Sequence, residues 1–227
     1  PNSSHARHPV QAPPDGPTCT RMNRRTLLLA PLLVPLLAGA APGPRDATDL
    51  ARIQAYLNSL HTLKAHFLQV APNGGTSQGL AWMQRPGRMR FQYAPPSPLL
   101  LVAGHGLFVF YDRDLKQTTN VPLGSTPLGM LLRENATLSG DVTVTDIDRQ
   151  PGLIQITLVR TASPGDGSLT LIFADNPLAL RQWTVRDAQG RETRVTLYDI
   201  ELGGTFDQDM FSFVDPKFVP GGDKYYR

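Results

Sequence analysis

The sequence predicts a mainly β protein in which about 11 antiparallel strands form a barrel or half-barrel. Two observations support this fold class. From residue 62 onward, short segments with alternating apolar and polar side chains follow one another, as strands with one buried face do. Turn dipeptides such as Pro86-Gly87 and Pro151-Gly152 separate these segments at regular spacing. Closely spaced strands with short connections are typical of meandering sheets and barrels.

A targeting segment precedes the predicted domain. Met22 opens a basic stretch that leads into the apolar run TLLLAPLLVPLLAGA, which ends in the small residues of a signal-peptidase site. The run contains two prolines and is shorter than the roughly 20 apolar residues of a membrane-spanning helix. We therefore expect a signal peptide at 22–40, cleaved after Ala40, and one folded domain at 41–227. Residues 1–21 are expected to be a disordered upstream segment, and an uncleaved membrane anchor is the alternative for the leader.

Charge and cysteine content exclude several functional classes. Four of the 22 basic residues but only one of the 19 acidic residues lie in the first 40 positions, so the rest of the chain is formally neutral. A nucleic acid partner requires a basic surface, so none is expected. The only cysteine, Cys19, precedes the leader, which leaves the domain without a disulfide, thiol chemistry or a lipidation site. We expect a soluble exported protein held together by packing.

Two helical segments interrupt the strand pattern. Asp46 or Thr48 is placed to cap the first, an amphipathic helix predicted from apolar residues at three- and four-residue steps: Leu50, Ile53, Leu57 and Leu60. The second is the apolar segment TPLGMLLRENA at 126–136, with Pro127 in its first turn. A short helix in the middle of a meander is expected to plug one end of the barrel.

Patterns that resemble catalytic or metal sites lack the partners that such sites need. GTSQG at 75–79 matches the G-x-S-x-G elbow of hydrolases, but a Gly-rich turn precedes it and a strand follows. No acidic residue lies between Ser77 and His105, the last histidine, so the order Ser, acid, His is absent. His61 and His66 are spaced so that one element cannot direct both toward one ion. We predict a hairpin turn at 75–79, no enzymatic activity, and no metal or other cofactor.

Two strands in the first half are apolar on both faces, so both faces must be covered. They are PLLLVAG at 98–104 and LFVFYD at 107–112. One face is expected to rest on the N-terminal helix, and the other faces either a closed core or a cavity. The candidate cavity residues come from neighbouring strands and the second helix: Trp82, Met89, Phe91, Tyr93, Leu101, Phe110, Met130, Leu131 and Leu132.

Several motifs together resemble the LolA family of periplasmic outer-membrane lipoprotein carriers. FLQ follows the amphipathic helix, and GLAWMQRPGRMRFQY occupies 79–93. LLVAGHGLFVFYDRDLKQ is then followed by the proline-led apolar segment. The resemblance covers about residues 46–219, although Phe218 stands where related proteins carry glycine after Pro-Lys.

The resemblance implies an incomplete antiparallel barrel, closed by helices, whose apolar interior receives the acyl chains of a lipoprotein. It implies that Arg85, the arginine of the Arg-Pro pair, hydrogen-bonds the helical lid and governs its opening. Alternation places Arg88 and Arg90 on the opposite, wetter face of their strand.

The resemblance also implies passive transport through the periplasm by a monomer. An ABC-type inner-membrane complex would load the acylated lipoprotein, and an outer-membrane lipoprotein receptor would accept it. Two alternatives remain open, a periplasmic carrier of a free lipid or glycolipid and a secreted hydrolase.

Overall fold

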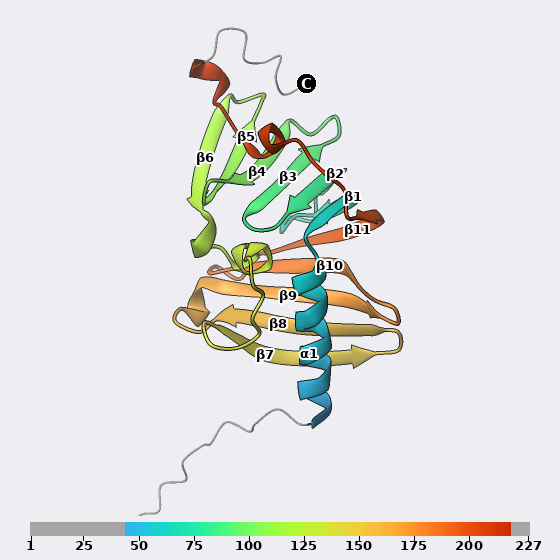
Figure 1. The fold of residues 1–227 in the computed structure, drawn as a ribbon. Coiled ribbons are helices and arrows are strands. Elements are labelled where there is room, and N and C mark those ends of the chain that lie inside the picture. Colours follow the sequence, from blue (N-terminus) through green and yellow to red (C-terminus); the bar gives the residue numbers. More distant parts are fainter. Residues whose placement is uncertain (1–43, 219–227) are drawn as a thin grey trace, which may run out of the picture. The chain divides into compact units, whose positions relative to one another are not determined.

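One helix and 11 strands form the framework of the computed structural model, which describes residues 44–218 (Figure 1). The helix is α1 (Pro44–Ser59). The strands are β1 (Thr62–Val70), β2 (Thr76–Gln84), β3 (Arg88–Tyr93), β4 (Leu99–Gly104), β5 (Leu107–Asp112), β6 (Gln117–Pro122), β7 (Val142–Gln150), β8 (Leu153–Arg160), β9 (Gly167–Asp175), β10 (Leu178–Asp187) and β11 (Glu192–Leu202). Short 3₁₀ helices are η1 (Leu123–Ser125), η2 (Pro127–Leu132), η3 (Pro164–Asp166), η4 (Gln208–Phe211) and η5 (Pro216–Phe218).

All 11 strands belong to one antiparallel sheet in the order β6-β5-β4-β3-β2-β1-β11-β10-β9-β8-β7. Two meanders, β1 to β6 and β7 to β11, are joined by the pairing of β1 with β11. Within the described residues β6 and β7 each pair with a single neighbour, so the sheet stays open. The predicted fold class, mainly β with an incomplete antiparallel barrel, is therefore confirmed.

The turn predicted at GTSQG lies a few residues earlier, because the hairpin turn occupies residues 71–75 and most of GTSQG belongs to β2. The connection between β1 and β2 ends at Gly75, and Ser77 lies inside β2 rather than on a turn into a helix. The described residues belong to the compact unit 41–227. The predicted segments 1–21 and 22–40 lie outside the described residues.

The sheet has two differently covered faces. Side chains of alternate residues, such as Phe67, Phe91 and Phe173, share the main hydrophobic cluster, and we call this side the core face. The opposite side, the back face, carries a smaller buried group that includes Leu100 and Tyr111.

Helix α1 covers the core face of β7 to β10 (Figure 1). The Tyr56 ring meets Phe173 edge-on at 5.8 Å between centroids, and the Tyr56 hydroxyl accepts a hydrogen bond from the Leu180 amide at 3.0 Å. The Arg149 guanidinium on β7 pairs with the carboxylates of Asp46 at 2.7 Å and Asp49 at 2.8 Å. These contacts fix the helix across the second meander.

The placement of α1 corrects two expectations. The helix was expected over β4 and β5, but it packs on the second meander. It also begins at Pro44, so Asp46 and Thr48 lie inside the helix instead of capping it. The Asp46 carboxylate in the first turn still faces the positive end of the helix dipole, where a negative charge is favourable.

The chain after β11 covers the back face of β3 to β5 (Figure 1). The Phe211 side chain is buried there, and the Phe213 ring packs on Tyr111 at 5.3 Å between centroids. The segment approaches so closely that a Cβ on Gly104 would lie 2.2 Å from the Phe211 carbonyl oxygen. Arg90, predicted on a wetter face, is instead buried under this segment and donates to the Met210 carbonyl at 3.1 Å.

The second predicted helix is confirmed as the 3₁₀ helix η2. The Thr126 hydroxyl accepts a hydrogen bond from the Gly129 amide at 3.2 Å and so caps its start. Five of the six residues of η2 are buried, and the helix packs against β8, β9 and β10. No helix in residues 44–218 combines the length and the apolar character needed to cross a membrane.

Candidate functional site

An apolar cavity of about 350 Å³ lies on the core face, between the first meander and strands β10 and β11. The start of η2 forms part of its wall. Its lining is mostly aliphatic and aromatic: Gln69, Phe91, Tyr93, Leu99, Leu101, Phe108, Phe110, Thr126, Pro127, Leu128, Trp183, Val185, Asp187, Thr193 and Val195. A cavity of this size and character suits an apolar ligand.

Four of the predicted cavity residues line this space: Phe91, Tyr93, Leu101 and Phe110. The Phe91 ring packs on Phe67 at 4.7 Å in a tilted contact and on Trp183 at 6.0 Å edge-on, so aromatic rings in contact with one another support this wall of the cavity. Phe110 stays 44% exposed and Leu99 37% exposed, although both belong to the lining. These two side chains therefore mark an open, apolar part of the rim.

The structure brings four more of the predicted residues close to the cavity without placing them in its lining. Met89, Met130, Leu131 and Leu132 are buried in the hydrophobic core beside it. From η2, it is Pro127 and Leu128 that reach the cavity.

Trp82 lies on the back face, away from the cavity. Its neighbours Ala81 and Met83 are buried in the core, and successive side chains of a strand point to opposite faces. The register agrees, because Trp82 lies opposite Lys64 on one side and Arg90 on the other. The prediction that Trp82 lines the cavity did not take this alternation of side chains into account.

The sequence-based prediction missed the contribution of the second meander. Trp183, Val185 and Val195 form the opposite wall of the cavity. The alternation in LRQWTVRD identified Trp183 and Val185 as sharing one face of a strand, but nothing local indicated that this face meets β3 to β5.

Arg85 lies directly after β2 with its side chain buried, since only 8% of the residue is exposed. Its guanidinium donates only to main-chain carbonyls. On one side it donates to the carbonyl of Leu57 in the last turn of α1 and to that of Leu60, just after the helix, at 3.4 Å. On the other side it reaches Arg133 at 2.7 Å and Glu134 at 3.3 Å, just after η2.

The position of Arg85 follows from charge as well as from shape. The last carbonyls of a helix carry partial negative charge, so a cation at this end is favourable. Burial lowers the pKa of the Arg85 guanidinium from its usual value. Arginine nevertheless stays charged in proteins, and its planar fork can bond two elements at once. Arg85 therefore ties the end of α1 to the chain that follows η2.

Residues 126–138, which contain η2, form what we call the capping segment. Besides Arg85, two side chains of α1 hold it. The Asn58 amide bonds the main chain of Ala136 twice, at 2.8 and 3.2 Å, and the Gln54 carbonyl accepts from the Leu138 amide at 3.1 Å. The turn after Arg85 adds a bond from the Gly87 amide to the Leu132 carbonyl at 2.8 Å. The capping segment is thus fastened by a few polar contacts on top of its apolar packing.

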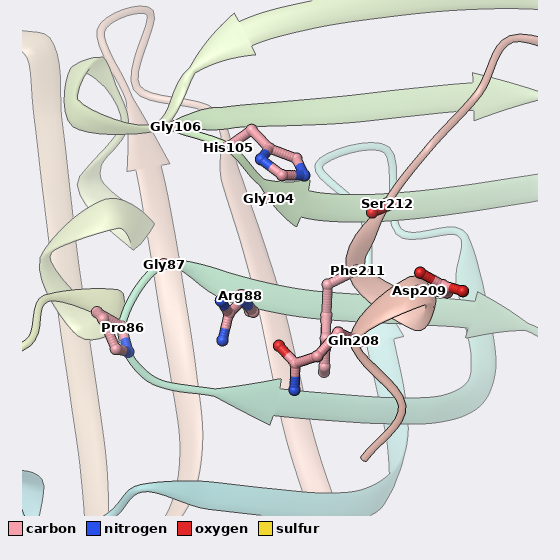
Figure 2. Close-up of a pocket in the computed structure, with 10 residues that line it drawn as sticks. All are labelled: Pro86, Gly87, Arg88, Gly104, His105, Gly106, Gln208, Asp209, Phe211 and Ser212. Atoms are coloured by element: carbon pink, nitrogen blue, oxygen red, sulfur yellow. The ribbon is translucent and has the colours of Figure 1, made fainter.

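A second pocket, of about 340 Å³, lies between η4 and the turns that end β2 and β4 (Figure 2). Figure 2 shows His105 at the turn between β4 and β5, with Arg88 and Gln208 facing the space between β3 and η4. His105 and Gly106 both have positive φ, 49° and 79°, as the two central residues of a tight hairpin turn require. Within residues 44–218 no group of three potential metal ligands occurs.

Comparison with known proteins gives consistent matches. The model of the family described as outer membrane lipoprotein carrier protein LolA matches residues 58–214. An outer-membrane lipoprotein carrier protein of Methylococcus capsulatus is 30% identical over 197 residues, covering 83% of this chain and 94% of that protein. One of Legionella pneumophila strain Paris is 31% identical over 182 residues, covering 76% and 88%. Among solved structures, a LolA superfamily protein of Nitrosomonas europaea matches with a TM-score of 0.42 and 9% identity, covering 72% of this chain and 97% of that one.

Proposed function

Because the chain belongs to the LolA family of outer-membrane lipoprotein carrier proteins, we propose that its apolar cavity binds the acyl chains of lipoproteins. The protein would carry them through the periplasm from the inner to the outer membrane. The family consists of transport proteins rather than enzymes, and membership implies a periplasmic location. The single observation that supports acyl-chain binding most directly is the apolar cavity with its exposed rim residues Leu99 and Phe110.

The physical need for such a carrier is large. Transferring an acyl chain from an apolar environment to water costs about 0.8 kcal/mol per CH₂ group, so a multiply acylated protein does not cross an aqueous compartment unescorted. The cavity of about 350 Å³ is at the small end of ligand pockets. We infer that several chains fit only when the capping segment moves and joins more of the core face to the cavity.

We propose that Arg85 is the latch of this movement. Its bonds to α1 and to the chain after η2 would have to separate when the capping segment opens. The free energy of opening is subtracted from the binding free energy, so the latch moderates the affinity for cargo. It also limits the apolar surface that the empty protein exposes.

The proposed partners follow from the same energetics. Loading removes acyl chains from a membrane and therefore needs an energy source, which we assign to an ABC-type complex in the inner membrane. Release requires an acceptor with a more favourable site, which we assign to an outer-membrane lipoprotein receptor. We propose that the carrier itself acts as a monomer and a passive shuttle.

Displacement of an environment-sensitive apolar dye from the purified protein tests the proposal. A lipopeptide with an acylated N-terminal cysteine is expected to displace the dye, whereas the same peptide without acyl chains is not. Competition by a free glycolipid but not by the lipopeptide would instead favour a free-lipid carrier. Absence of dye binding and of competition would refute a lipid-chain cavity.

A further inference from the structure

Three of the polar residues that line the cavity lie at the same end of neighbouring strands. Gln69 lies near the end of β1, Asp187 at the end of β10 and Thr193 near the start of β11. These three strands are neighbours, because β1 pairs with β11 and β11 pairs with β10. Gln69 is opposite Val195, two residues from Thr193 on the same face. The rest of the wall is almost entirely apolar, so a ligand would meet these groups with only one of its ends.

Tyr93 positions Gln69 at this end. The Tyr93 hydroxyl donates to the Gln69 Oε1 atom at 2.8 Å. The two side chains come from β3 and β1, with β2 between them, and Gly79 of β2 makes their approach possible. Gly79 lies opposite both Phe67 and Tyr93, and the rings of these two residues meet above it at 5.1 Å. A Cβ at Gly79 would lie 2.1 Å from the Gln92 carbonyl oxygen.

This arrangement leaves hydrogen-bond donors free inside the cavity. Gln69 uses its carbonyl oxygen for Tyr93, and its two amide hydrogens have no partner among residues 44–218. The Thr193 hydroxyl likewise has no hydrogen-bond partner within the described part of the chain. Burial raises the pKa of Tyr93 to about 12, so its hydroxyl stays protonated and keeps the amide oriented at physiological pH.

The carboxylate of Asp187 restricts which ligand group can accept hydrogen bonds from Gln69 and Thr193. Asp187 accepts from the amides of Gln189 at 3.0 Å and Arg191 at 2.9 Å and from the Arg191 guanidinium at 2.8 Å, so the turn holds its side chain in place. An anionic head such as a free fatty acid would place a second carboxylate beside it, which is unfavourable. A neutral ester carbonyl accepts from the free donors and adds no negative charge beside Asp187.

We propose that Gln69, oriented by Tyr93 and assisted by Thr193, binds an ester carbonyl at the head of the acyl chains. The polar end would thus select ester-linked chains and set the depth to which they enter the cavity. This inference rests on the proposed function, because it assumes that acyl chains occupy the cavity.

The test compares two ligands that differ only in the carbonyl groups. One is a peptide whose N-terminal cysteine carries an S-dipalmitoylglyceryl group with ester links, and the other is its ether-linked counterpart. Their affinities are measured by displacement of an apolar dye from the purified protein. From the net free energy that one neutral hydrogen bond contributes, we expect the ester-linked peptide to bind about 3- to 10-fold more tightly than the ether-linked one.

The double variant Gln69→Met/Tyr93→Phe is expected to abolish this ester preference. Both partners are replaced because Gln69→Met alone would leave the buried Tyr93 hydroxyl without an acceptor. Gln78→Met is the matched control, since Gln78 is exposed on the back face, opposite Leu68. The control should keep the wild-type ratio.

Each outcome distinguishes this inference from the proposed function. Equal affinities of the ester and ether forms for the wild-type protein, both for the peptides and for dipalmitoylglycerol and its diether, or an unchanged ratio in the double variant, would overturn the ester site and leave the acyl-chain cavity intact. Failure of both peptides to displace the dye would overturn the two proposals together. Repeating the comparison with dipalmitoylglycerol and its diether identifies the source of the carbonyl: an ester preference limited to the peptides assigns the site to acylated proteins, and one limited to the glycerolipids assigns it to free lipid.

Discussion

Replacing Arg85 with leucine is expected to loosen the capping segment without unfolding the sheet. Opening separates this segment from α1, and Arg85 can follow only one of the two. If it stays with α1, the bonds to the Arg133 carbonyl at 2.7 Å and the Glu134 carbonyl at 3.3 Å are lost. A good hydrogen bond from a charged donor contributes about 1.5–3 kcal/mol, and the longer bond contributes less. The latch therefore contributes about 2–3 kcal/mol to closure, or about 30- to 150-fold in the opening equilibrium.

Amide hydrogen exchange of the capping segment measures this quantity directly. The amides of Ala136 and Leu138 are bonded to side chains of α1 and should exchange about 30- to 150-fold faster in Arg85→Leu. Amides in the centre of β1 should change much less. The free energy needed to open the capping segment is subtracted from the free energy of binding. A variant that opens more easily should therefore bind apolar dye and lipopeptide more tightly and release them more slowly.

Arg88→Leu is the matched control for this experiment. Arg88 is half-buried three residues further along the chain, and its side chain makes no hydrogen bond or ion pair with any of the residues 44–218. It should leave exchange in the capping segment unchanged. Unchanged protection of Ala136 and Leu138 in Arg85→Leu would refute the latch, whatever happens to cargo binding.

Three further predictions concern the helix, the capping segment and the rim of the cavity. Burial alone would raise the pKa of Asp49, but its bonds to Arg149 and Arg52 together outweigh burial and lower it. This stabilisation is present above the unfolded pKa of about 4 and is lost as the pH falls through the folded value. Urea unfolding between pH 6 and pH 2 should therefore show a steeper loss of stability in the wild type than in Arg149→Met, and parallel curves would contradict this. Asn58→Ala should lower the free energy of unfolding by about 1–2 kcal/mol, because two hydrogen bonds to the capping segment are lost. A loss below about 0.3 kcal/mol in urea titration would show that these bonds contribute nothing. Phe110→Ser should weaken dye and lipopeptide binding by about tenfold. Leu68→Ser, at a similarly exposed position on the back face, should leave this binding unchanged. Equal effects of the two substitutions would argue against an acyl site at this rim.

Alternation and turn residues were sufficient to predict most of the framework. The two-residue period located the strands, and the three- and four-residue period located α1, because local burial patterns determine both. The same local patterns do not determine which strands pair when they are far apart in the sequence. Pairing of β1 with β11 sets the two meanders side by side, and that long-range contact determined where α1 packs and which residues face Phe91 across the cavity.

Two errors in the candidate site have different physical origins. The side of Trp82 could have been deduced, since the hairpin register places Met83 opposite Met89 and so puts Trp82 with Arg90 on the other face. The burial of Arg90 could not, because the segment that covers it has no periodic pattern and folds against the sheet through Phe211 and Phe213. The role of Gln69 also required the structure, as its partner is two strands away.

The pairing of β1 with β11 also has a consequence for how the protein is made. The first strand to emerge during synthesis completes its pairing with the last one, and the partners Leu63 and Leu202 are far apart in the chain. Contacts of this separation form slowly, and until they form, β1 and β11 each present a long unpaired edge with an apolar face. A chain truncated before Glu192 would leave β1 and β10 permanently unpaired at these edges and should aggregate. Folding of this protein can therefore be completed only when nearly the whole chain is present.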